Sequence, residues 1–448
     1  MSALIAYRPI SAVGAKMWTD FPLDQIKLDL QTLRSIGADT IRVSLFPSIA
    51  YPVMPSLEQY RLQQFIGACA ELDMRVKLVL FGGIKPWLDT PDSIAYLDNF
   101  HWYYNLNKVI DSVDLYDELD LDVIGTNAWP IGISIAADQV FGNIPITIST
   151  NSVDNLTKLV NATKTQGHID FFDYHYYTDK PQNAYYDFQQ LLAIAPSICI
   201  GETGFSTVPR PADSKSQVQW LDYQGHHART VFHAADALGL DVGYWEGFDH
   251  PASAFVTPPT DPGELYYGLY DANNNAKPAL DALKNLWKGS DLEFDYSFYK
   301  FDTDGAPIGW SKKLMAGTTL TSNQFEQSIS LSNCPTGSSE LTCIPVMPII
   351  PGNTYEFSCY MAGFNITGGR SAIRISWHAQ DGSYIGSNWS ASLPVGGTQW
   401  TRFATQQVKP PAGTVSAMMH LSIENSVGKT SFREPTFHNL TWPHTTEI

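Results

Sequence analysis

Apolar positions in the first two thirds of the chain alternate between two spacings. The spacing of a helix face is followed by Leu23, Ile26 and Leu30, and the next apolar run, DTIRVSLF at 39–46, has the length of a buried strand. The same alternation recurs to about residue 288. The clearest helical pattern covers 218–238. We therefore expect helices and strands to follow one another through this region.

Eight such units can be counted, each with one apolar run of strand length. The predicted strands cover 12–18, 39–46, 75–81, 111–119, 144–150, 169–177, 197–203 and 241–249. Short buried strands separated by amphipathic helices are typical of a parallel sheet, and eight units are the number that closes a barrel. The sequence thus predicts an α/β fold, a (β/α)8 TIM barrel, over residues 1–288.

The pattern changes after residue 288. Helical periods disappear, and short alternating segments such as TYEFSCYMAGF and SAIRISWHA are separated by Gly, Pro, Ser and Asn. This predicts an all-β antiparallel sandwich over 289–448. Cys334 and Cys343 flank a polar segment, NCPTGSSELTC, which we expect to be a loop. They could close a small disulfide, although spacing alone leaves their pairing open.

Composition narrows the classes of partner. The chain has 448 residues, of which 44% are hydrophobic and 16% charged, so it is expected to build cores. A formal net charge of -17 argues against nucleic acid and anionic membranes as partners. The sequence contains no apolar run of about 18 residues and begins without a visible signal peptide. Localisation stays open, with secretion or the cell surface compatible with the composition.

Two acidic positions stand where predicted strands end. Glu202 follows the apolar run 198–200 within GETG, and Asp117 and Glu118 end the strand at 111–119. Active sites of such barrels lie at the carboxyl ends of the strands. Two carboxylates facing each other there are the minimal apparatus of glycoside hydrolysis. For any single acid, a strand cap or an ion pair is the simpler interpretation.

The combination of motifs resembles clan A glycoside hydrolases, the family-5-like cellulases, mannanases and their relatives, over about residues 12–288. The resemblance implies that Glu202 is the nucleophile and Glu118 the acid/base. It also implies substrate-site roles for residues at the other strand ends, which are Arg42, Asp117, His175, Tyr177 and Trp245. The segment after 289 resembles jelly-roll carbohydrate-binding modules, with Trp389 favoured over Trp377 as a sugar contact.

One departure from the clan pattern concerns Asp117, where an Asn usually precedes the acid/base. An ionised Asp can only accept a hydrogen bond, so Asp117 could read a different sugar or share a proton with Glu118. Asp117 could also be the acid itself, although motif position favours Glu118. Glu246 and Asp249 follow Trp245 and could line the cleft. No spacing typical of a metal site occurs, and we expect neither a metal nor another cofactor.

These observations favour a retaining β-glycosidase that acts on a polysaccharide or oligosaccharide. One alternative is a hydrolase of an exopolysaccharide with family-39-like specificity. Another is a catalytically inactive carbohydrate-binding protein. In each case the expected partner is a carbohydrate, and neither nucleic acid nor a membrane is implied.

Overall fold

The computed structural model describes most of the chain, and its described part forms two compact units. The described residues are 3–45, 54–82, 90–100, 109–124, 128–208, 217–287, 294–295, 306–307, 310–323, 326–343 and 346–441. One unit comprises Met1–Asp179 and Asp187–Lys288. The other comprises Lys180–Tyr186 and Gly289–Ile448.

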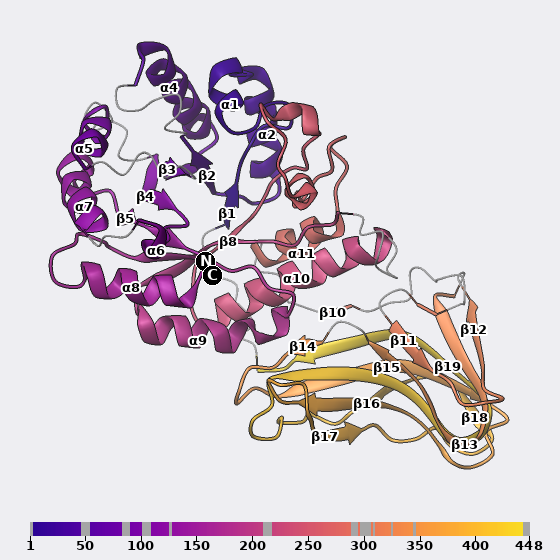
Figure 1. The fold of residues 1–448 in the computed structure, drawn as a ribbon. Helices are drawn as coiled ribbons and strands as arrows, with labels where there is room; N and C mark the ends of the chain where they lie inside the picture. The colour runs from indigo at the N-terminus through magenta and orange to yellow at the C-terminus, as the bar shows by residue number, and fades with distance from the viewer. Residues whose placement is uncertain are drawn as a thin grey trace. The chain divides into compact units, whose positions relative to one another are not determined.

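The first unit is built around a parallel sheet that curls into a nearly closed barrel (Figure 1). Its strands are β1 (Ala3–Ala6), β2 (Thr40–Ser44), β3 (Arg75–Gly82), β4 (Ile110–Asp117), β5 (Ile146–Thr147), β6 (Ser149–Thr150), β7 (Phe172–His175), β8 (Ile198–Thr203) and β9 (Val242–Tyr244). The order across the sheet is β5-β4-β3-β2-β1-β9-β8-β7-β6. Because β5 and β6 are two halves of one short run, the two ends of the sheet meet there. The predicted (β/α)8 barrel is confirmed.

Helices follow the barrel strands and lie around them (Figure 1). They are α1 (Ala15–Asp20), α2 (Leu23–Ser35), α4 (Ser56–Glu71), α5 (Thr90–Asp98), α6 (Leu121–Ile124), α7 (Ala128–Phe141), α8 (Val153–Thr163), α9 (Ala184–Ile194), α10 (Gln217–Ala237) and α11 (Pro278–Trp287), with short 3-10 turns at η3 (Pro181–Asn183), η4 (Ala252–Ala254) and η5 (Pro262–Leu265). The helical spacing seen in the sequence is the buried face of α2, where Ile26, Leu30 and Leu33 are fully buried. Over the described residues, no helix has the length and apolar character needed to cross a membrane.

The first strand lies earlier than the sequence pattern predicted. The run 12–18 was expected to be a strand, but Ala15–Asp20 is helix α1 and Ala3–Ala6 is strand β1. All four residues of β1 are buried, and Leu4 pairs with β2 on one side and β9 on the other. A strand that lies between two neighbouring strands needs only a short apolar run, and four residues are therefore enough to form β1.

The second unit is an antiparallel sandwich, as predicted. Its strands are β10 (Phe294–Asp295), β11 (Trp310–Lys313), β12 (Thr319–Asn323), β13 (Ser328–Cys343), β14 (Met347–Pro348), β15 (Tyr355–Phe364), β16 (Arg370–His378), β17 (Tyr384–Trp389), β18 (Gly397–Ala404) and β19 (Ser416–Asn439). The long strand β19 pairs with β13, β15 and β16 and so holds the sheet together. Its apolar side chains pack into one core with those of the neighbouring strands.

The expected loop between Cys334 and Cys343 is instead part of strand β13, and the disulfide is absent. Both thiols are free and buried. Cys334 lies opposite Ser426 of β19, whereas Thr342, the neighbour of Cys343, lies opposite His420, so the two cysteines lie apart along the sheet and beyond the reach of a disulfide. The turn-forming residues of NCPTGSSELTC are accommodated by two register shifts against β19, on either side of Cys334.

The tryptophans of the sandwich differ in burial. Trp377 is fully buried in the core, as a packing residue would be. Trp389 is half-buried, and the guanidinium carbons of Arg370 and Arg374 lie 4.4 and 5.0 Å from its ring centroid. Binding of sugar by this unit stays a prediction.

Candidate active site

The predicted site residues gather at the carboxyl ends of the barrel strands. Asp117 is the last residue of β4 and His175 the last of β7, and Trp245 directly follows β9. Glu202 lies near the end of β8. The fold therefore brings side chains from distant parts of the sequence to one end of the barrel.

Glu202 lies between two glycines, Gly201 and Gly204, and close packing of the chain requires glycine at both positions. A Cβ on Gly201 would lie 2.0 Å from Oδ1 of Asp173, and one on Gly204 would lie 2.1 Å from the carbonyl oxygen of Trp245. Neither position has room for a side chain. The motif GETG thus reflects tight packing of β8 against both neighbouring strands, which fixes the backbone that carries Glu202.

Glu202 is only 5% exposed, and three side chains hold its carboxylate. Arg42 donates from Nη1 to Oε1, and the Tyr177 hydroxyl donates to Oε2 over 2.9 Å. Nδ1 of His175 lies 3.2 Å from Oε2. Burial raises the pKa of Glu202 to about 7, although the charges of Arg42 and His175 act to lower it. The sequence predicted that Arg42 belongs to the site, but not that burial would outweigh its charge in setting the pKa of Glu202.

Glu118 takes its position from a backbone turn and a second strand. Its φ of 57° lies in the left-handed region, just past the end of β4. The backbone N–H donates to Oγ of Ser149 over 3.0 Å, and Nδ2 of Asn151 donates to Oε2 over 2.8 Å. Ser149 and Asn151 were not recognised from the sequence, because their contacts with Glu118 join two different strands.

His175 connects the two glutamates. Its Nδ1 lies 3.0 Å from Oε1 of Glu118 as well as 3.2 Å from Glu202. One oxygen of each glutamate and a nitrogen of His175 all lie within 4.8 Å of one another. Burial lowers the pKa of His175, but Glu202 and the hydrogen bond with Glu118 outweigh it and raise the pKa to about 9. His175 is therefore a charged imidazolium at neutral pH, and it lies between the carboxyl groups of Glu118 and Glu202.

Asp117 shares Arg42 with Glu202. Nη2 of Arg42 donates to Oδ1 of Asp117 over 2.7 Å and to Oδ2 of Asp114 over 3.1 Å. Burial acts to raise the pKa of Asp117, but the charges of Arg42 and His175 outweigh it and hold that pKa below its ordinary value. Asp117 is thus ionised. Asp114, buried three residues earlier on β4, was not singled out in the sequence, although it interrupts an apolar run.

A second ion pair lies among the same strands. Lys77 of β3 donates to Asp173 of β7, and both side chains are buried. Lys77 is the neighbour of Arg42 in the pairing of β2 with β3. Burial lowers the pKa of Lys77, but Asp173 outweighs it and raises the pKa above its ordinary value. Charged residues thus fill part of the barrel interior, where apolar side chains are usual.

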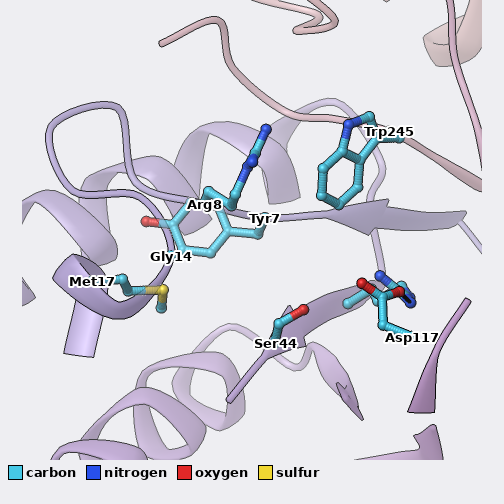
Figure 2. A pocket seen from close by; sticks show the side chains of 8 residues that line it. Tyr7, Arg8, Gly14, Met17, Ser44, Asp117 and Trp245 are labelled. Atoms are coloured by element: carbon cyan, nitrogen blue, oxygen red, sulfur yellow. Dashed lines mark hydrogen bonds and ion pairs between the residues drawn. The ribbon is translucent and has the colours of Figure 1, made fainter. Parts of the chain in front are cut away.

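A cavity of about 230 Å³ opens beside these residues (Figure 2). It is lined by Tyr7, Arg8, Gly14, Met17, Arg42, Ser44, Asp117 and Trp245. Arg8, two residues past β1, has its guanidinium carbon 4.5 Å from the centroid of the Trp245 ring. Arg8 was missed because its strand was placed too late in the sequence. Trp245 lies at the cavity, where the sequence predicted a sugar platform.

Glu246 lies behind the cavity and does not line it. Its side chain is fully buried, and it accepts hydrogen bonds from Arg8 at both oxygens, with Nε of Arg8 2.6 Å from Oε2. Nε2 of His250 lies 3.0 Å from Oε2. The expected position on the cleft wall is thus replaced by a buried one. Asp249 is buried as well and accepts from Lys277 over 2.6 Å.

The other described tryptophans of the barrel region do not line the cavity. Trp18 and Trp129 are fully buried and pack in the core. Trp87 and Trp102 lie outside the described residues. Trp245 is therefore the one tryptophan that the described residues bring to the cavity.

Among the described residues, two groups of side chains have donor atoms close enough together for a metal ion, although no metal was expected. They are Asp114, Asp117 and His175, and Glu118, His175 and Glu202. Arg42 donates to Asp114, Asp117 and Glu202. A cation of the protein itself thus already occupies this cluster of carboxylates.

Comparison with known proteins supports the barrel fold. No protein-family model and no curated protein matches the chain. Among solved structures, an exo-β-1,4-mannosidase from Opitutaceae bacterium strain TAV5 aligns with a TM-score of 0.51 and 18% identity, over 64% of this chain and 58% of that one. Less than two thirds of that enzyme is therefore spanned.

Two further structures are glycoside hydrolases of the group GH5_18 solved in complex with Manβ1-4GlcNAc. The protein from Bifidobacterium longum subsp. longum has a TM-score of 0.51 and 17% identity, over 64% of this chain and 78% of that one. The protein from Streptomyces cattleya has a TM-score of 0.51 and 15% identity, over 64% of this chain and 80% of that one. At such identities the likeness establishes a shared barrel fold.

Proposed function

We propose that the chain is a retaining β-glycoside hydrolase that acts on a polysaccharide or oligosaccharide, with Glu202 as nucleophile and Glu118 as acid/base. The observation that carries the proposal is the pair of opposed glutamates, with oxygens within 4.8 Å of each other. Retaining enzymes hold their carboxyl groups about 5–5.5 Å apart, whereas inverting enzymes need room for a water molecule between them. The sugar complexes of the similar barrels support a carbohydrate substrate.

The proposed reaction has two displacements. Glu202 attacks the anomeric carbon while the bond to the leaving oxygen breaks, and Glu118 gives that oxygen its proton. Glu118 then takes a proton from water, which attacks the same carbon and releases Glu202. Arg42 and Tyr177 hold the carboxylate of Glu202 in place for the attack, and Trp245 offers its ring to the sugar.

Two observations support Glu118 over Asp117 as the proton donor. Asp117 is bound to Arg42, and a carboxylate held by a guanidinium gives up a proton readily and regains it poorly. Glu118 makes no ion pair with an arginine or lysine among the described residues, and its side chain is 37% exposed toward solvent. Glu118 is thus the carboxyl group that a leaving group can reach.

The test is azide rescue of alanine variants on an aryl β-glycoside with a good leaving group. Such a substrate needs no proton in the first step, so Glu118→Ala should form the glycosyl-enzyme and stall. Azide entering the vacated space should release a β-glycosyl azide. Glu202→Ala should lose activity by orders of magnitude and form no covalent intermediate.

The matched variant is Asp117→Ala. If Asp117→Ala shows the stall and the rescue while Glu118→Ala does not, the acid is assigned to the wrong residue. If wild-type product has the inverted anomeric configuration, the retaining mechanism is wrong. If no glycoside of a broad panel is hydrolysed, the chain is a carbohydrate-binding protein without catalysis.

A further inference from the structure

Asp114 is a fully buried residue of strand β4, and its carboxylate accepts three hydrogen bonds. Oδ2 accepts from Nη2 of Arg42 over 3.1 Å. Oδ1 accepts from the backbone N–H groups of Ser149, over 3.1 Å, and of Tyr116, over 3.3 Å. An ionised carboxylate only accepts hydrogen bonds, so this form matches the three donors. Burial raises the pKa of Asp114 to about 6, which leaves the group ionised at neutral pH.

Oδ1 of Asp114 joins β4 to β6 where the backbone pairing of β4 ends. The register of β4 with β5 includes Val113 and Asp114. One residue separates β5 from β6, and Ser149, the first residue of β6, donates its N–H to the side chain of Asp114. The carboxylate therefore continues the contact between neighbouring strands beyond their last paired residues.

Ser149 carries this contact on to Glu118. Its Oγ accepts from the backbone N–H of Glu118 over 3.0 Å and donates to the carbonyl oxygen of Tyr116 over 2.9 Å. Its own carbonyl oxygen accepts from the N–H of Leu119 over 2.8 Å. Glu118 has a left-handed φ of 57°, which a residue other than glycine adopts only where its surroundings enforce it. Asp114 and Ser149 supply part of those surroundings.

Oδ2 of Asp114 acts on Glu202 through Arg42. Nη1 of Arg42 donates to Glu202, while Nη2 donates to Asp114 and Asp117. The guanidinium is one rigid planar group, so a bond that fixes Nη2 also fixes the direction of Nη1. Asp117 lines the cavity with a side chain that is 32% exposed, whereas Asp114 is buried beneath it. A bound substrate can therefore reach Asp117, but not Asp114.

Charge compensation of Arg42 does not by itself account for Asp114. Arg42 already donates to two other carboxylates, those of Asp117 and Glu202. Moving a third carboxylate out of water costs folding free energy, and an ion pair offsets this cost only when its geometry is good. Oδ1 of Asp114 is bound to backbone N–H groups and not to a cation. A role in placing Ser149 explains what charge balance leaves out.

We propose that Asp114 is a positioning residue, which holds the nucleophile Glu202 and the proton donor Glu118 at a fixed separation. The inference rests on the proposed function. One oxygen acts on Glu202 through Arg42, and the other acts on Glu118 through Ser149. Asp114 does not line the cavity, so it influences the reaction only through these two neighbours. A misplacement of about 1 Å at a reacting group can cost about a hundredfold in rate.

The test uses two aryl β-glycosides of one sugar that the wild-type protein hydrolyses. A dinitrophenyl glycoside needs no proton from Glu118 in the first displacement, so it reports on Glu202 alone. A phenyl glycoside needs that proton, so it reports on both glutamates. Single-turnover release of the phenol gives the rate of the first displacement at saturating substrate and the substrate concentration at half saturation.

Asp114→Asn keeps the shape but turns one accepting oxygen into a donating amide nitrogen. It should lower the rate of the first displacement about 10- to 100-fold on both glycosides and change the half-saturating concentration by less than about threefold. Ser149→Ala removes only the hydroxyl that meets Glu118. It should lower the rate about tenfold on the phenyl glycoside and leave the dinitrophenyl glycoside within about twofold of wild type. A purely structural role would not distinguish the two leaving groups.

The control is Asp249→Asn. Asp249 is 5% exposed, and its carboxylate accepts from Nζ of Lys277 over 2.6 Å and from the backbone N–H of Gly268 over 2.8 Å. It thus resembles Asp114 in burial and in having both a charged donor and a backbone donor. The substitution should leave both rates within about twofold of wild type. Thermal unfolding of each variant shows what share of the protein is folded, and rates are compared per folded molecule.

Failure of this inference is distinct from failure of the proposed function. If Asp114→Asn keeps both rates within threefold of wild type, or changes only the half-saturating concentration, the inference is wrong and the hydrolase stands. The same holds if Ser149→Ala slows both glycosides equally. Should Asp114→Asn fail to fold, Ser149→Ala decides alone, and the inference is wrong without the difference between leaving groups. If the wild-type protein hydrolyses no glycoside of a broad panel, the function and the inference are both wrong.

Discussion

The barrel and the sandwich bury different kinds of side chain. Among the described residues of the sandwich, the buried polar side chains are serines, threonines and His420, and the core itself is apolar. The barrel instead encloses charged groups, among them six that are each at most 5% exposed, namely Arg42, Lys77, Asp114, Asp173, His175 and Glu202. The two units thus obtain compact interiors in opposite ways.

The contrast separates what stabilises the fold from what the site requires. Moving a charged side chain out of water costs several kcal/mol of folding free energy per ion, and an ion pair offsets this cost only when its geometry is good. Apolar residues at the same positions would therefore stabilise the fold as well or better. These six residues all lie on strands β2, β3, β4, β7 and β8. We infer that they are kept for the chemistry at the strand ends, whereas the sandwich core is kept for stability.

The largest expected effect is that of Arg42→Met. Three carboxylates lose their shared cation, and Glu202 loses both its partner and a charge that lowers its pKa. Breaking a buried ion pair costs about 3–5 kcal/mol. We expect kcat/KM on an aryl glycoside to fall by about two to four orders of magnitude. Thermal unfolding should show the barrel to be less stable as well.

The matched control is Arg374→Met in the sandwich. Arg374 donates to Glu340 over 2.8 Å, and its side chain is 20% exposed. Losing that pair should leave kcat/KM unchanged. Retention of activity within tenfold by Arg42→Met would show that the charged interior is not needed for the chemistry.

A smaller effect, on stability alone, is expected from Leu421→Ala. Leu421 is fully buried on β19, where it pairs with Leu341 of β13 and Ile373 of β16. Removing such a side chain from a core costs about 2–5 kcal/mol. Calorimetry should show the loss in the transition of the sandwich, while kcat/KM on a small glycoside stays the same.

The control for this substitution is Val395→Ala, since Val395 is 75% exposed and should change stability by less than about 0.5 kcal/mol. Should Leu421→Ala lower kcat/KM without changing the sandwich transition, the division of roles between the two units would be wrong.

The sequence predicted those site residues that end an apolar run. Glu202, His175 and Tyr177 stand out because an apolar strand leads up to each of them. The barrel could be predicted for the same reason. Lys77, Asp114 and Asp173 were visible as charges inside apolar strands, but only three-dimensional pairing shows that they share one interior.

Other features depend on contacts that no local pattern reveals. Arg8 was missed because Ala3–Ala6 is too short to be recognised without its neighbours. Ser149 lies within the predicted strand 144–150, but it was missed because its contact with Glu118 of another strand has no counterpart in sequence spacing. The segment around Cys334 contains residues typical of a turn, and only pairing with β19 makes it a strand.

The smallest expected effect is a shift in the pH profile, and it depends on the charge that only the barrel encloses. Glu202 must be ionised to attack, and its pKa is raised to about 7, chiefly by burial. The acid limb of kcat/KM should therefore fall as pH drops through about 7, since this profile reports groups of the free enzyme.

His175 lowers the pKa of Glu202 by its positive charge. In His175→Gln the charge is gone, so the pKa of Glu202 should rise and the acid limb should move to higher pH. His420→Gln in the sandwich is the control, because His420 is also buried but lies in the other unit and should leave the limb in place. An acid limb that stays put or moves to lower pH in His175→Gln would mean that the imidazolium does not act on Glu202 by its charge, and that the buried charges of the barrel do not set the ionisation of the nucleophile.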